Sequence, residues 1–365
     1  MKKGIIYGIL VLLTVFLTSC HIGRYFWWNF AEIDDYKKFN NENIQNAAPV
    51  FSFPVQPIPM KFDVTEQYKE DFSTFEEMLE KNSTVAFLVI RNDSILYENY
   101  FNKYNQNTIA TSFSVAKSIV SALIGIAVSE GKIASIDQPV TDYLTEMKCA
   151  DMKKVTIRHI LNMESGIRFN EGYVNPFGHV AKFYYGRNLE RYANKLKLKR
   201  EPGEKYEYAS GNTQLLAFVI EKATGKKLAA YLEEKLWKPM GMESPASWSI
   251  DSRKHGNAKA FCCVNALPRD YAKIGRLYLN KGNWNGQQLV PQAWVEESVY
   301  NVEVTEKMKY HFQWRVLDSG AFFAMGVHGQ FIYVNPAKQL IIVRNGKKYG
   351  KVNWIRIARE IEKGL

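Results

Sequence analysis

The alternation of hydrophobic and polar positions predicts a helix, a hairpin and a second helix in the first third of the chain. Residues 72–80 have the spacing of a short amphipathic helix. Two strand-like runs follow at 84–90 and 95–100, and a short polar turn joins them as a hairpin. A long apolar helix is then predicted from about residue 114 to residue 129, with Gly131 at its expected end.

The pattern changes again over the rest of the chain. Residues 140–248 are mainly helical by spacing, whereas 312–317, 330–334 and 340–343 favour strands and 354–361 a closing helix. Strands at both ends with helices between them indicate an α+β fold, in which both chain ends form one mostly antiparallel sheet flanked by helices. A helical lobe is inserted into this arrangement, and a catalytic cleft is expected between the two lobes.

The first twenty residues have the layout of a secretory signal. Lys2 and Lys3 precede an apolar run over 5–17, and Leu17-Thr18-Ser19-Cys20 follows. The run is too short to span a bilayer as a stable helix. The small residues before the cysteine look like a bacterial lipobox, so we expect Cys20 to be acylated and the exported protein to be held at the cell envelope as a lipoprotein. An ordinary cleaved signal is the alternative.

The remaining chain divides into a tether and a folded domain by composition. Residues 21–60 carry an aromatic patch at 24–28 and then Asn- and Pro-containing sequence, which predicts a membrane-proximal tether. Residues 61–365 are long enough for a sizeable core. Within them we expect a sheet lobe at about 61–133 and 256–365, and a helical lobe at about 134–255.

Charge and cysteine content exclude several classes of function. The formal net charge is +11, but the lysines are scattered and form no basic stripe interleaved with aromatics, so no nucleic-acid partner is expected. A cationic surface facing anionic envelope material fits better. Cys149 and the adjacent Cys262 and Cys263 form neither a small-protein disulfide framework nor a zinc-ligand spacing, so no metal and no cofactor are expected. Cys262 and Cys263 have no assigned role and are expected in the buried core.

Ser114 and Lys117 are the candidate nucleophile and base. A serine hydroxyl is a weak nucleophile until a nearby base removes its proton. Three residues apart at the start of a helix, the two side chains share one face, and the free N–H groups of the first turn lie near a developing oxyanion. Lys117 can act as a base only where burial and neighbouring cations lower its pKa, and the apolar helix that follows provides such surroundings.

The same Ser-x-x-Lys spacing recurs at Ser129 and Lys132, so the motif alone is weak evidence. Gly131 places this second match at the carboxyl end of the helix. Free carbonyl groups point outward there and disfavour an oxyanion, so we reject it.

Five segments taken in order resemble the β-lactamase-related serine hydrolases, a family that includes class C β-lactamases, D,D-peptidases, esterases and 6-aminohexanoate-dimer hydrolases. The resemblance covers roughly residues 70 to 350 and implies a β-lactamase/transpeptidase-like fold. The segments are 111–118 (TSFSVAKS), 155–166 (VTIRHILNMESG), 202–212 (PGEKYEYASGN), 269–277 (RDYAKIGRL) and 289–295 (LVPQAWV).

The resemblance also implies roles for residues of the second motif. Tyr208 is the second-motif tyrosine, which would relay a proton between serine, lysine and leaving group; the alternative is a core tyrosine. Ser210 stands where the family usually has asparagine, which weakens any claim to β-lactam hydrolysis. Tyr173 lies where the esterase and 6-aminohexanoate-dimer hydrolase branch of the family carries a loop over the site. The sequence does not decide whether it contacts substrate or is a surface or lobe-packing tyrosine.

The third motif falls within residues 324–330 (AMGVHGQ), which contain no lysine. This version is more similar to the esterase and 6-aminohexanoate-dimer hydrolase branch. It implies that Gly326 opens a segment lining the site and that the backbone N–H of Val327 is the second oxyanion donor beside that of Ser114. His328 is a candidate for substrate contact, although a lone histidine is more often structural.

We therefore expect an envelope-anchored serine hydrolase that cleaves a small-molecule ester or amide through an acyl-enzyme on Ser114, bound to the membrane through lipid on Cys20. A β-lactamase or D,D-peptidase acting on cell-wall-like peptides is the alternative enzyme. A catalytically silent envelope binding or sensor module on the same fold is the alternative outside enzymes, although it has no chemical need for an intact Ser114, Lys117 and Tyr208. The natural substrate is not specified by the sequence.

Overall fold

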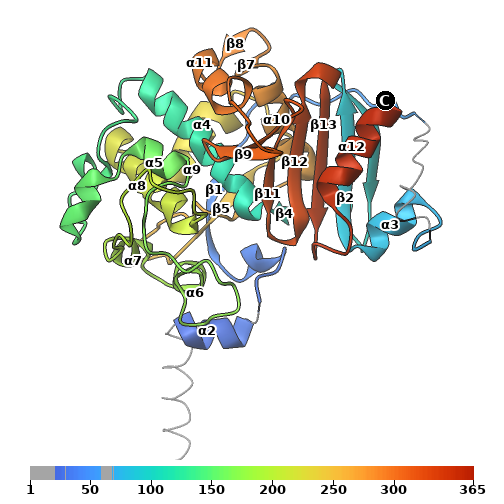
Figure 1. Cartoon of the computed structure of the whole chain (residues 1–365). Helices are drawn as coiled ribbons and strands as arrows, with labels where there is room; N and C mark the ends of the chain where they lie inside the picture. Colours follow the sequence, from blue (N-terminus) through green and yellow to red (C-terminus); the bar gives the residue numbers. More distant parts are fainter. Residues whose placement is uncertain (1–20, 29, 59–67, 69) are drawn as a thin grey trace, which may run out of the picture.

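A seven-stranded antiparallel sheet forms the right-hand part of the molecule as drawn in Figure 1. The computed structural model describes residues 21–28, 30–58, 68 and 70–365. The strand order is β3-β2-β13-β12-β11-β10-β9, so both ends of the domain contribute, which confirms the predicted sheet. The strands are β2 (Thr84–Arg91), β3 (Ser94–Tyr100), β9 (Met308–His311), β10 (Trp314–Leu317), β11 (Phe322–Gly326), β12 (Gln330–Asn335) and β13 (Leu340–Gly346).

Both faces of this sheet are buried. Alternate residues of β2 belong to different cores: Leu88 packs in the larger cluster with α4 (Ala116–Ser129) and α10 (Pro268–Leu279), whereas Phe87 packs in a second cluster with α3 (Phe75–Lys81) and α12 (Trp354–Gly364). A strand covered on both faces needs apolar residues at every position, which explains the nearly continuous apolar run of β2.

In the sequence, the helical lobe lies between strands β2 and β3 and strands β9 to β13 of this sheet, as predicted. Its core is α8, which packs against α4 and ends where Gly225 adopts a φ of +70°. The lobe contains α5 (Ile157–Leu161), α6 (His179–Tyr185), α7 (Leu189–Ala193), α8 (Ser210–Thr224) and α9 (Leu228–Leu232). Beyond it lie the small hairpin β7 (Asn283–Trp284) and β8 (Gln287–Gln288) and the helix α11 (Gln292–Val295).

Residues 21–28 and 30–58, within the segment expected to be a tether, contain regular secondary structure. They form α2 (His21–Trp28) and β1 (Asn40–Ile44), and β1 joins a second sheet of order β1-β5-β6-β4 with β5 (Ala246–Ile250), β6 (Val264–Ala266) and β4 (Ala110–Thr111). Ile33 and Ile44 are buried, so this segment supplies core side chains and packs on the domain for that reason.

The predicted signal and Cys20 lie outside the described residues. Within the described part of the chain, no helix is both long and apolar enough to cross a membrane.

Candidate active site

The nucleophile turn connects β4 to the central helix α4. Ser114 lies in a single 3₁₀ turn, Phe113–Val115, and α4 begins two residues later than predicted, at Ala116. Phe113 has a φ of +44°, a region that bulky residues rarely adopt. Ser112 holds this strained turn on β6, because its N–H donates to Val264 O at 2.8 Å and its Oγ accepts from Val264 N–H at 3.1 Å.

Lys117 lies one helical turn after Ser114 and is almost completely buried. Its Nζ donates to Ser114 Oγ at 3.0 Å and to the carbonyl oxygen of Phe261 at 2.7 Å. Among the described residues, no carboxylate forms a hydrogen bond with Lys117 Nζ. The structure thus brings together the serine and the lysine that the sequence selected, in direct contact.

Tyr208 completes this group from the segment that precedes α8. The centre of its ring lies 5.1 Å from Lys117 Nζ. Tyr310 of β9 meets the same ring edge to face, with 5.9 Å between the ring centres, and the Arg315 guanidinium lies 5.6 Å from the Tyr208 ring. Burial and the neighbouring Tyr208 raise the pKa of Tyr310 well above its ordinary value, although Arg315 opposes this shift, so Tyr310 stays protonated.

The end of β11 approaches the backbone of the nucleophile turn. A Cβ atom on Gly326 would lie 2.8 Å from Ser114 N and 2.9 Å from Ser112 O, so only glycine fits this position without displacement. Val327 follows in a 3₁₀ turn and lines the cavity described below. The expected third motif is therefore at the site, next to the backbone nitrogen of Ser114.

His328 lines the same cavity but is already bonded to protein. It adopts a φ of +63°, packs edge to face on Phe113, and its Nε2 lies 2.7 Å from Ala31 O, a contact that requires the Nε2–H tautomer. The sequence left His328 open between a substrate contact and a structural role. The geometry gives it a contact with the N-terminal segment.

A buried arginine supports the third-motif turn from behind. Arg344 Nη1 donates to His328 O at 2.9 Å and to Gly329 O at 2.8 Å, and its Nε donates to Thr84 Oγ1. The guanidinium carbon lies 3.7 Å from the centre of the Trp354 ring. Burial lowers the pKa of Arg344 to about 9. The described residues place no carboxylate beside the guanidinium, which is held instead by its hydrogen bonds to carbonyl oxygens and by the Trp354 ring.

Ser210 and Tyr173 meet at a carboxylate that the sequence analysis did not select. Glu171 accepts from Ser210 Oγ at 2.6 Å, from Ser210 N–H at 2.8 Å and from the Tyr173 hydroxyl at 3.1 Å. The side chain at the usual asparagine position is thus engaged with Glu171. Ser210 and Tyr173 both line the cavity, but this network holds their polar atoms in place.

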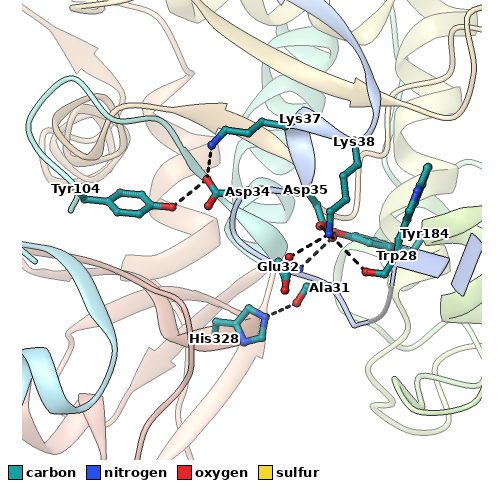
Figure 2. Close-up of polar contacts among 10 residues, drawn as sticks. All are labelled: Trp28, Ala31, Glu32, Asp34, Asp35, Lys37, Lys38, Tyr104, Tyr184 and His328. Carbon is teal, nitrogen blue, oxygen red and sulfur yellow. Dashed lines mark hydrogen bonds and ion pairs between the residues drawn. The ribbon is translucent and has the colours of Figure 1, made fainter. Parts of the chain in front are cut away.

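The N-terminal segment 30–38, here called the strap, forms one wall of the site. Figure 2 shows its contacts with the sheet lobe: Ala31 O meets His328 Nε2, and the Tyr104 hydroxyl donates to Asp34 Oδ1 at 3.0 Å. Thr111 N–H also donates to Ile33 O, at 3.3 Å and three residues before the nucleophile.

The strap is bonded to the helical lobe as well. The Tyr184 hydroxyl of α6 donates to Asp35 Oδ2 at 2.7 Å (Figure 2). Within the strap, Lys38 forms ion pairs with Asp35 at 2.9 Å and with Glu32 at 3.0 Å. Because the strap is hydrogen-bonded to both lobes, it holds the two lobes together at the cleft.

A cavity of about 230 Å³ opens at Ser114. Most of its lining is aromatic or aliphatic, with a few polar groups near the nucleophile, a composition typical of a small-molecule site. The lining residues are Phe30, Ala31, Phe113, Ser114, Tyr173, Val180, Ala181, Tyr184, Tyr185, Ser210, Phe261, Cys262, Val327 and His328.

Cys262 is joined to Cys263 by a disulfide bond, and both residues are buried. Burial was expected, whereas the bond between neighbours was not, since a pair of adjacent cysteines gives no pairing signal. The bond lies directly after Phe261, whose carbonyl holds Lys117.

No cluster of three or more candidate metal ligands occurs among the residues that the structure describes.

Comparisons with known proteins agree with this geometry. A family model described as Beta-lactamase matches residues 73–357. The 6-aminohexanoate-dimer hydrolase of Paenarthrobacter ureafaciens is 28% identical over 292 residues, which cover 74% of each chain. Esterase EstB of Burkholderia gladioli is 31% identical over 151 residues, 38% of each chain. A solved Bacillus anthracis structure, whose name assigns it to the 6-aminohexanoate-dimer hydrolases, superposes with a TM-score of 0.82 at 26% identity and covers 93% of this chain and 92% of its own.

Proposed function

This chain belongs to the beta-lactamase family of serine hydrolases, and from that premise we propose that it cleaves an ester or amide through an acyl-enzyme on Ser114. The observation that carries the proposal is the contact between Lys117 Nζ and Ser114 Oγ, with the amine buried and held by Phe261 O. As the base, Lys117 would accept the Ser114 proton across this contact while its Nζ keeps the hydrogen bond to Phe261 O.

The proposed reaction has two halves. Ser114 Oγ bonds to the substrate carbonyl carbon while its proton passes to Lys117 Nζ. The bond to the leaving alcohol or amine then breaks as that group takes this proton from Lys117 through Tyr208. In the second half, water bonds to the acyl carbon and gives its proton to Lys117, and the bond to Ser114 Oγ breaks as Oγ takes that proton back, which releases the acid.

Two backbone donors would stabilise the oxyanion. Gly326 brings the chain against Ser114 N, which supports the N–H groups of Ser114 and Val327 as the pair. Donors fixed in a folded backbone need no reorganisation when charge develops on the carbonyl oxygen.

Esterase or amidase activity is favoured over β-lactam hydrolysis by the site itself. Ser210 stands at the asparagine position and is engaged with Glu171, and residues 324–330 contain no lysine. The names of the relatives include an esterase and a 6-aminohexanoate-dimer hydrolase, but also a penicillin-binding protein and a D-alanyl-D-alanine carboxypeptidase, so the preference rests on the site residues.

We propose further that the protein is exported and held at the cell envelope by lipid on Cys20. The lysines, apolar run and lipobox-like residues of 1–20 support this. Metabolic labelling with an alkyne-bearing fatty acid tests it: label is expected on the full chain and is lost in Cys20→Ser. Equal labelling of both proteins contradicts it.

Covalent labelling tests the proposed function. The full chain is exposed to a fluorophosphonate and, separately, to a penicillin, and its intact mass is measured. Fluorophosphonate labelling is expected for the wild type and for Ser129→Ala, which removes the second Ser-x-x-Lys match, but not for Ser114→Ala. Penicillin labelling at Ser114 would favour the β-lactamase or D,D-peptidase alternative. No labelling by either reagent would favour a binding module.

A further inference from the structure

Exposed apolar side chains lie on two segments that reach the cavity, one through Phe30 and the other through Tyr173. The two segments are α2 with the start of the strap, and the loop before α6. Trp27 is 74% exposed, Val174 is 76% exposed and Phe177 is 66% exposed, and Phe26, Phe30 and Tyr173 are also exposed. These six residues are here called the mouth patch. Contiguous apolar surface of this kind marks a binding face.

The two segments are in contact and open into the active site. The Tyr25 hydroxyl of α2 donates to Tyr173 O at 3.5 Å, and α2 packs along α6, as Figure 1 shows at the lower edge of the molecule. Phe30 and Tyr173 belong both to the mouth patch and to the lining of the cavity. The patch is therefore continuous with the route to Ser114.

The sequence before α2 indicates what covers the patch. Cys20, the proposed site of lipid attachment, comes directly before α2, which starts at His21, so the lipid would hold α2 at the membrane. Tryptophan and other aromatic side chains favour the interface between lipid and water. Arg168 and Lys199 line a surface hollow together with Phe177, so basic residues lie beside the patch and suit anionic headgroups.

We propose that the mouth patch rests on a lipid bilayer and that the substrates are esters or amides of apolar acyl chains that enter the cavity from the membrane. This inference rests on the proposed hydrolase function and adds the substrate class and the surface from which substrate comes. The aliphatic and aromatic lining, including Val180, Ala181 and Phe261, suits an acyl chain. Ser114 lines the same cavity, so the carbonyl carbon of a bound ester or amide would lie next to its hydroxyl.

The test compares two substrates on the full chain reconstituted in phosphatidylcholine and phosphatidylglycerol vesicles. One is a long-chain acyl ester dissolved in the bilayer, and the other is a short, water-soluble ester of the same alcohol. The test variant is the triple substitution Trp27→Ser, Val174→Ser, Phe177→Ser, none of which lines the cavity at Ser114. The matched control substitutes exposed apolar residues elsewhere: Val50→Ser, Ile58→Ser and Tyr349→Ser.

Hydrolysis of the bilayer ester is expected to fall about tenfold or more in the test variant. The variant loses the apolar side chains that would insert into the bilayer and hold the opening of the cavity against it. Hydrolysis of the soluble ester is expected to stay unchanged, and the control is expected to match the wild type on both substrates. Equal loss on both substrates, or no loss on either, overturns the inference.

A second readout is independent of catalysis. Quenching of tryptophan fluorescence by brominated lipids is expected in the wild type and is expected to fall in Trp27→Phe. If neither ester is hydrolysed but this quenching is seen, the proposed function fails while the membrane face stands. If Trp27→Phe leaves the quenching unchanged, the membrane face fails.

Discussion

Gly326 is the residue on which the oxyanion geometry depends most directly. A Cβ there would lie 2.8 Å from Ser114 N and 2.9 Å from Phe113 Cβ, so an alanine must push the β11 end away from the nucleophile turn. We expect Gly326→Ala to lower kcat by about 10²-fold with a smaller change in KM, because the donors serve the transition state. Steady-state kinetics with circular dichroism measures this. Gly364→Ala, which meets nothing within 4 Å, is the control, and a kcat for Gly326→Ala within a factor of two of it would contradict the prediction.

Lys117 provides the second prediction at the residue scale. Replacement by alanine removes the only amine in contact with Ser114 Oγ among the described residues, so we expect turnover to fall by about 10²- to 10⁴-fold with the fold intact. Lys132→Ala, in the rejected second motif, is expected to keep wild-type turnover. Near-normal activity of Lys117→Ala would remove lysine as the base.

The sequence singled out the candidate nucleophile and base but not the residues that hold them. Ser114 and Lys117 lie three positions apart, so one helical turn places them together. Glu171 meets Ser210 across 39 positions, and Ala31 meets His328 across 297. No local spacing encodes such contacts, because they arise only when the lobes and the strap pack.

At the scale of elements, helix α10 is attached to the loop before β5 through a buried ion pair. Lys273 Nζ lies 3.1 Å from Asp270 Oδ1 with both side chains fully buried. Asp270 accepts from Glu243 N–H at 2.7 Å, and Lys273 donates to Gly241 O at 3.0 Å. The pair therefore fixes residues 241–243 on α10.

Removing one partner of this pair leaves an uncompensated buried charge. We expect Lys273→Met to lower the free energy of unfolding by about 3–5 kcal/mol. The double variant Lys273→Met, Asp270→Asn is expected to recover part of that loss. Urea unfolding of the three proteins measures both effects. A loss below about 1 kcal/mol in Lys273→Met would show that the charge is not buried in solution.

The elements differ in how far the sequence predicted them. The hairpin of β2 and β3 matches the predicted runs within a residue, since its apolar positions are strong. Strand β1 was missed because Asn40–Ile44 is polar except for its last residue and forms a strand only by pairing with β5. Short strands of this kind depend on a partner rather than on their own propensity.

At the scale of the whole molecule, Lys259 lies where three parts of the chain meet. Its fully buried Nζ donates to Tyr184 O at 2.7 Å and lies 4.4 Å from the centre of the Phe39 ring. Burial is the largest cause that lowers the pKa of Lys259, to about 7 from the ordinary 10.5. Between these two values the unfolded chain binds a proton that the folded protein does not, so stability rises with pH.

We expect this group to add about 1.4 kcal/mol of stability per pH unit between pH 7.5 and 9.5, and Lys259→Met to lack that rise. Below pH 7 both states carry the proton, so the contribution to the slope disappears. Urea unfolding of the wild type and the variant at several pH values measures the difference. Parallel curves for the two proteins would contradict a neutral, buried Lys259.

The strap has a consequence for how new specificities arise in such proteins. Residues 30–38 close one side of the cavity, yet they precede the segment 73–357 that defines the family. Substitutions confined to the strap would alter the shape of the pocket while Ser114, Lys117 and Tyr208 stay untouched. Ile33 of the strap is buried, so a replacement segment would have to keep that core contact. Within this limit, substrate preference can change without any change inside the segment that the family model matches.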